Sequence, residues 1–209
     1  MTLTRTRLLA LLAIVGAFAA ATVVVSACGD DEKTASKPSG TPKEQAFLQG
    51  MVPHHMMAIE MAEMAQQMAT KPEIKQLASS IVKSQGGEIE KMNAIYGRLF
   101  AGAALKPNEM AHDELGLTAD QAGMAMTDKE MQAMMGAKPF DREFIDMMIP
   151  HHQGAIRMAR VVLASTKDPE IRSLAQAIVT AQSKEIEEMN GWRTSWFGKP
   201  SPAGGVPTA

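Results

Sequence analysis

Apolar residues recur at helical spacing in two long stretches of the chain, and each stretch contains two segments. In the second segment, the core-type positions alternate in steps of four and three residues, which is the spacing of a helical bundle. These positions are Ile74, Ala78, Ile81, Gln85, Glu88 and Met92, then Ile171, Ala175, Ile178, Gln182, Glu185 and Met189. Pro72 and Pro169 suit the first turn of a helix, where a missing amide donor is harmless. Each stretch therefore predicts a helical hairpin.

The two hairpins are copies of one another. Residues 47–100 align with residues 144–197 without a gap, at a constant offset of 97 positions. A single hairpin cannot bury its apolar stripe, so the two are expected to join into one all-α four-helix bundle. The bundle is expected at residues 44–198, with repeat one at 44–100, a crossover linker at 101–139 and repeat two at 140–198.

Pro53 and Pro150 lie about two turns inside otherwise continuous helical patterns, so each helix either kinks or begins at its proline. Phe47 and Phe144 keep the apolar phase across the prolines, which favours a kink. A kink leaves one main-chain carbonyl without its helical partner beside the histidines discussed below. In the linker, short helices are expected near 108–115 and 128–135.

The first 28 residues have the layout of a secretory signal that ends in a lipoprotein processing site. Arg5 and Arg7 precede an apolar run at 8–25, which leads through small residues to Cys28. We expect a signal peptide at 1–27 and a lipid on Cys28 that anchors the exported protein to the outer face of the cell membrane. A retained transmembrane anchor is the alternative.

The composition excludes several classes of protein. Cys28 is the only cysteine, so internal disulfides are excluded. Removing the signal takes the net charge from −2 to about −4, and nucleic acid is not an expected partner. No phosphate-binding loop or activated nucleophile is evident, which makes an enzyme the less expected class.

Polar residues at 28–43 predict a flexible tether, and residues 199–209 predict a disordered tail.

Each repeat carries a His-His pair on its first helix and a Gln-x-x-Glu on its second. These residues are His54, His55, Gln85 and Glu88, then His151, His152, Gln182 and Glu185. Because the two helices of a hairpin rise equally per residue, a turn near 71 places His54 level with Glu88, and a turn between 168 and 169 places His152 level with Glu185. Both repeats are expected to contribute to one polar layer, and which histidine of each pair faces the core is left open.

Imidazole and carboxylate groups inside a helical bundle suit a first-row transition metal. The alternative is a set of neutral histidines that hydrogen-bond to glutamate and hold the two hairpins in register. The Glu-x-x-His motif of di-iron carboxylate bundles is absent from both repeats.

Methionine is unusually frequent, with 18 residues in the chain. Thioether sulfur is a soft ligand that favours Cu(I), whereas gap filling is the ordinary role of core residues such as Met61 and Met92. In the linker, Met124 and Met126 are candidates for a soft-metal site that His112 would join.

The repeated Met-[Val/Ile]-Pro-His-His-x-x-Ala-Ile-x-Met-Ala, followed by Gln-x-x-Glu-Ile-x-x-Met, closely resembles the domain of unknown function 305 family. The resemblance covers roughly residues 43–198 and implies a ferritin-like helical bundle in exported proteins, some of them linked to copper. The family's signature falls on Met51, His54, His55, Met148, His151 and His152, together with Gln85, Glu88, Gln182 and Glu185.

The leading hypothesis is a membrane-anchored extracytoplasmic protein that sequesters or hands over copper, as Cu(I) or Cu(II), or silver. Other transition metals remain open. The alternatives are a metal-dependent redox enzyme of ferritin-like type and a metal-free structural or interaction module. The sequence leaves homo-oligomer formation and protein partners undecided.

Overall fold

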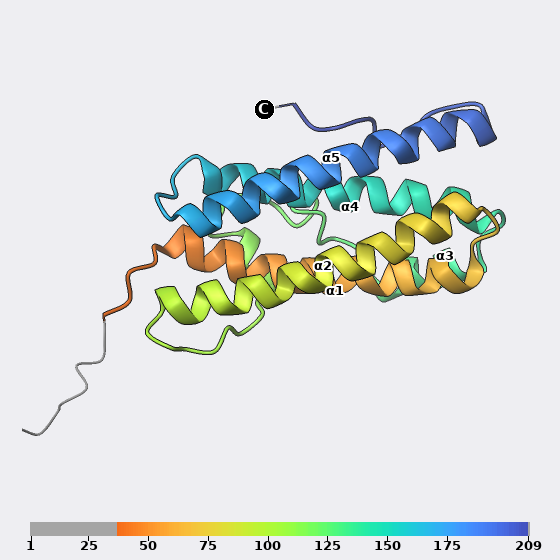
Figure 1. The fold of residues 1–209 in the computed structure, drawn as a ribbon. Coiled ribbons are helices and arrows are strands. Elements are labelled where there is room, and N and C mark those ends of the chain that lie inside the picture. The colour runs from red at the N-terminus through yellow and green to blue at the C-terminus, as the bar shows by residue number, and fades with distance from the viewer. Residues whose placement is uncertain (1–36, 209) are drawn as a thin grey trace, which may run out of the picture. The chain divides into compact units, whose positions relative to one another are not determined.

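The computed structural model describes residues 37–208, which form five α-helices and one short 3-10 helix (Figure 1). The helices are α1 (Pro42–Met68), α2 (Pro72–Leu99), η1 (Glu109–His112), α3 (Asp128–Gly136), α4 (Phe140–Leu163) and α5 (Pro169–Phe197). Within this described part the fold is all-α, as the sequence predicts, and no helix in it is both long and apolar enough to cross a bilayer. The expected signal peptide and Cys28 lie outside the described residues.

Side-chain caps and prolines define where the long helices begin. At the start of α1, Thr41 accepts a hydrogen bond from the Glu44 amide, and the Glu44 carboxylate accepts one from the Thr41 amide. Helices α1, α2 and α5 each have proline in the first turn. Asp168 caps α5 through the amides of Glu170 and Ile171. The starts of α2 at Pro72 and of α5 at Pro169 agree with the sequence, and all three helix starts are set by local chemistry.

Helices α1 and α4 run antiparallel and bring the two hairpins together (Figure 1). At one end, Thr166 after α4 donates a hydrogen bond to Glu44 of α1, with an oxygen-to-oxygen distance of 2.6 Å. At the other end, Asp141 of α4 accepts hydrogen bonds from Thr70 and Lys71 after α1. Glu44 and Asp141 occupy equivalent positions in the two repeats. Each hairpin thus binds the turn of the other through the same acidic position.

Both helices continue through their internal prolines, so neither begins there. Pro53 has no amide proton for the carbonyl of Gln49, four residues earlier. That carbonyl instead accepts a hydrogen bond from the amide of Asn108, at 3.0 Å. The linker therefore supplies the donor that proline removes from α1.

The linker packs tightly against α1 and α4. Ala111 of η1 lies over Gly50, and a side chain at Gly154 would overlap the carbonyl of Ala122. Only Glu109–His112 of the helix expected near 108–115 is helical, whereas α3 agrees closely with the expectation for 128–135. Glycine at 50 and 154 is what allows the linker backbone to approach the two central helices.

Two expectations about the ends of the bundle are wrong. The expected tether at 28–43 is partly structured: α1 begins at Pro42, and the amides of Ser39 and Gly40 donate to the carbonyl of Leu99. The expected disordered tail at 199–209 is also bound along its described part, because Gln153 donates to the carbonyls of Ala203 and Gly205. Composition alone did not reveal these contacts, since the partners lie at least 50 residues away in sequence.

Candidate metal centre

His54 of α1 and His151 of α4 meet at the contact between the two hairpins. Their ring centroids are 3.7 Å apart, and His54 and His151 are 0% and 1% exposed. His54 donates from Nε2 to the main-chain carbonyl of His151 at 3.0 Å. Two buried apolar clusters form the interior, and one contains Met51 while the other contains Met148. The polar layer therefore lies within an otherwise apolar interior.

The second histidine of each pair binds the glutamate of its own hairpin. His55 Nε2 lies 2.7 Å from Glu88 Oε2, and His152 Nε2 lies 2.6 Å from Glu185 Oε2. Both histidines are fully buried, whereas the glutamate side chains are 14% exposed. The carboxylates therefore link the buried imidazoles to the edge of the bundle.

The structure confirms that the two pairs meet Gln-x-x-Glu segments but corrects one partner. Counting from a turn near 71 predicts His54 level with Glu88, whereas His55 is the residue that binds it. The offset of 97 between the repeats puts the first turn between 71 and 72, and counting from there pairs His55 with Glu88, as His152 pairs with Glu185. Adjacent residues differ by about 100° in direction, so His55 points to α2 while His54 points to α4.

The hydrogen bonds determine which ring nitrogens carry protons. A carbonyl only accepts, so His54 carries its proton on Nε2 and leaves Nδ1 as a lone pair. His55 and His152 donate to carboxylates through Nε2 in the same way. A histidine that ligates a metal characteristically donates its other ring N–H to a carboxylate or carbonyl. Glu88 and Glu185 therefore accept these hydrogen bonds and orient the rings of His55 and His152. The Nδ1 atoms are the ring nitrogens whose lone pairs are available to bind a metal.

Burial keeps the two central histidines neutral. It lowers the pKa of His54 well below 6.5, and nearby His55 and His152 lower it further. Burial likewise lowers the pKa of His151, with His54 as the next largest cause. Neutral imidazole is the form that binds metal ions.

Among the described residues, every buried side-chain nitrogen or oxygen that lacks a hydrogen-bond partner belongs to this layer. The atoms are Nδ1 of His54, His55, His151 and His152, Nε2 of His151, and Nε2 and Oε1 of both Gln85 and Gln182. Leaving one such group buried and unpaired costs about 1–3 kcal/mol. The layer is thus rich in imidazole and amide donors that a transition-metal ion would engage.

Neither the histidines nor the carboxylates of the layer form a three-ligand metal cage. Across residues 37–208, no three His, Cys, Asp or Glu side chains converge as ligands for one ion. The layer therefore offers its imidazole nitrogens one or two at a time, and imidazole suits copper better than it suits an oxygen-seeking ion such as Mg²⁺ or Ca²⁺.

Residues 44–204 match the family described as Domain of unknown function (DUF305). The chain belongs to this family. A DUF305 fragment from Deinococcus radiodurans is 31% identical and has a TM-score of 0.64, with 76% of this chain and 99% of the fragment covered. Uncharacterized protein L153 of Acanthamoeba polyphaga mimivirus is 46% identical over 50 residues, which are 24% of this chain and 33% of the viral protein. The chain thus spans about a third of that relative's length.

The chain is also similar to CopM, whose solved structures include Cu(I)-bound, Cu(II)-bound, Ag-bound and apo forms. The Cu(I)-bound form is 38% identical and has a TM-score of 0.63, with 74% of this chain and 98% of CopM covered. CopM, a structural neighbour of this DUF305 chain, therefore binds copper and silver ions. Copper is a metal that imidazole nitrogens such as those of the histidine layer suit.

The methionines of the repeated DUF305 motif lie inside the bundle. Met51 and Met148 are completely buried, each one turn before the first histidine of its pair. They pack in apolar clusters, which is the ordinary role of core methionine.

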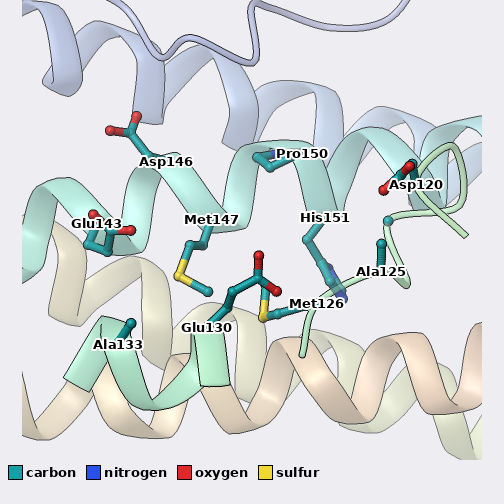
Figure 2. Close-up of a pocket in the computed structure, with 11 residues that line it drawn as sticks. Asp120, Ala125, Met126, Glu130, Ala133, Glu143, Asp146, Met147, Pro150 and His151 are labelled. Atoms are coloured by element: carbon teal, nitrogen blue, oxygen red, sulfur yellow. The ribbon is translucent and has the colours of Figure 1, made fainter. Parts of the chain in front are cut away.

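The linker methionines are separated rather than gathered into one site. Met124 packs against the same cluster as Met51, whereas Met126 packs against the other cluster. His112 does not join them, because its Nδ1 donates to the carbonyl of Leu117 at 3.0 Å. Met126 instead lines a pocket with Met147 and His151 (Figure 2). Met147 was missed in the sequence, although it precedes His151 by one helical turn.

Proposed function

We propose that this DUF305 protein is a membrane-anchored extracytoplasmic protein that binds copper or silver ions in its histidine layer and sequesters them or hands them over. The observation that carries the proposal is the concentration of unpartnered buried donor atoms at equivalent positions of the two repeats. A site that only held the hairpins in register would pair these groups with one another, because unpaired buried polar groups are destabilising.

The similarity to CopM supports the choice of metal. CopM has been solved with Cu(I), Cu(II) and silver, and it is 36–39% identical to this chain in these forms. Imidazole binds both oxidation states of copper, so the donor set is compatible with all three ions. A bound ion would accept lone pairs from the histidine Nδ1 atoms, while Glu88 and Glu185 hold the rings of His55 and His152 in place.

The proposed location rests on the sequence of the first 28 residues. A lipid on Cys28 would place the bundle at the outer face of the membrane, where it meets incoming metal before the cytoplasm does. Metabolic labelling with a radioactive fatty acid tests this part separately. Label is expected on the full-length chain and not on the Cys28→Ser variant, and an unlabelled wild-type chain would contradict it.

Metal binding is tested by titrating the metal-free chain with Cu(I), Cu(II) and Ag(I) against competing chelators. The variant His54→Leu/His151→Leu is expected to weaken binding by at least about tenfold, since it removes two ligands. His55→Gln/His152→Gln is a second variant that keeps a polar side chain beside each glutamate. The matched control is His112→Asn, which preserves a donor toward Leu117 outside the layer.

The two alternatives give different results in the same preparation. Unchanged metal affinity in both histidine variants would show that the histidine layer does not bind the metal. Absence of binding in the wild-type chain would favour a metal-free module. Bound metal combined with consumption of O₂ or peroxide would favour a redox enzyme.

A further inference from the structure

A pocket of about 370 Å³ opens between α3 and α4, next to the histidine layer. Met126 of the linker, Met147 of α4 and His151 of α4 all line it (Figure 2). The side chains of Met126 and Met147 point toward one another across the pocket, with Glu130 of α3 between them in this view. The pocket therefore brings two thioethers and one imidazole together from two separate segments.

His151 connects this pocket to the buried layer. It is 1% exposed, and neither of its ring nitrogens has a hydrogen-bond partner among the described residues. Its ring also lies 3.7 Å from that of His54, centroid to centroid. An ion bound in the pocket would thus reach the layer through a single side chain that belongs to both.

The two methionines are placed differently from those in the core. Met61 and Met158, at equivalent positions of the repeats, are fully buried and fill the apolar interior. Met126 and Met147 are only partly buried and line an open hollow. Thioether sulfur binds soft ions such as Cu(I) and Ag(I) and discriminates against Cu(II) relative to imidazole or carboxylate.

The charge around the pocket favours a cation. Its lining contains four carboxylates and no lysine or arginine: Asp120, Glu130, Glu143 and Asp146. Asp146 pairs with Arg193, and one oxygen of Glu130 accepts hydrogen bonds from Thr127. Asp120 and Glu143 have no ion-pair partner within residues 37–208. A cleft lined by one sign of charge concentrates ions of the opposite sign.

We propose that Met126, Met147 and His151 form a capture site for a soft monovalent ion, Cu(I) or Ag(I), and that this pocket is the port through which such ions reach His54 and His151. The inference rests on the proposed metal-binding function and specifies its entry route and its preference for the monovalent ion.

The test compares Ag(I) and Cu(II) affinities of the full chain and of Met126→Leu/Met147→Leu. Leucine keeps nearly the volume of methionine, so folding is expected to survive, and circular dichroism checks it. The variant is expected to bind Ag(I) at least about tenfold more weakly while Cu(II) affinity stays within about twofold. The matched control, Met61→Leu/Met158→Leu, makes the same exchange in the core and should change neither affinity. X-ray absorption of the Cu(I)-loaded wild-type chain should show sulfur ligands that the pocket variant lacks.

Unchanged Ag(I) affinity in the pocket variant, together with an absence of sulfur ligands in the wild-type chain, would overturn the capture site and leave the histidine layer in place. Equal losses of Ag(I) and Cu(II) affinity would also overturn it, because a structural defect would not discriminate between soft and harder ions. Failure of the unaltered chain to bind either ion would overturn the proposed function as well.

Discussion

His54 donates a hydrogen bond to the main-chain carbonyl of His151, the residue that occupies its own position in the second repeat. His151 donates no equivalent hydrogen bond to the main-chain carbonyl of His54, because its Nε2 has no partner among the described residues. The repeats therefore diverge at their shared contact. Gly123 of the linker lies over this point, where a side chain would come within 2.8 Å of the His151 carbonyl oxygen. The asymmetry occurs where Gly123 of the linker lies against His151.

The unpartnered atoms of the central histidines should make the metal-free protein less stable than an apolar variant. His54→Leu/His151→Leu removes three of these atoms, and the free energy of unfolding without metal is expected to rise by about 1–3 kcal/mol. Urea unfolding with and without Cu(II) measures this, and the variant should lose the stabilisation that added metal gives the wild-type chain. A less stable variant would indicate that the histidines serve the bundle's own cohesion.

The two glutamates should affect metal affinity through the histidines they orient. In Glu88→Gln/Glu185→Gln the new amide no longer fixes the proton on Nε2 of His55 and His152. Metal affinity is expected to fall about 10–100-fold, measured by chelator competition. Glu90→Gln/Glu187→Gln, an exposed pair at equivalent positions on α2 and α5, provides the control. Equal affinities in the two variants would show that the carboxylates do not orient the ligands.

Asp141 should make the contact between hairpins sensitive to acid. Burial alone would raise the pKa of its carboxyl, but hydrogen bonds from Thr70 and Lys71 outweigh that effect and lower the pKa below 3.8. The stability it contributes is therefore present above pH 3.8 and is lost as pH falls through the lower, folded-state pKa.

Asp141→Asn should lower the free energy of unfolding at pH 7 by about 1–3 kcal/mol and weaken its pH dependence below pH 4. Urea unfolding at pH 7 and in a series below pH 4 tests both effects, with exposed Glu90→Gln as the control. A loss of stability that is the same at every pH would contradict the assigned role of the carboxylate.

Gly154 should be required for the linker to dock. An added methyl group would overlap the carbonyl of Ala122, so Gly154→Ala is expected to cost about 1–3 kcal/mol and to raise amide hydrogen exchange in residues 119–124. Gly86→Ala provides the contrast, because nothing lies within 4 Å of the added atom. That change should stabilise α2 by up to about 1 kcal/mol. Matching effects from the two changes would show that the close approach has no energetic role.

The sequence alone predicted the all-α class, the paired hairpins and the presence of both His-His pairs beside Gln-x-x-Glu segments. These features follow from periodicity and duplication, which are properties of the linear chain. The starts of α2 and α5 were also predictable, because Pro72 and Pro169 act on their immediate neighbours.

Only the tertiary structure decided which histidine of each pair faces the other hairpin. The contact of His54 with His151 depends on the direction in which each side chain leaves its helix, which residue counting does not contain. The separation of Met124 from Met126 and the docking of the tail on Gln153 depend on surfaces made by segments distant in sequence. Spacing along a chain determines which side chains share an element and a height, whereas their directions and distant neighbours are set only when the elements pack.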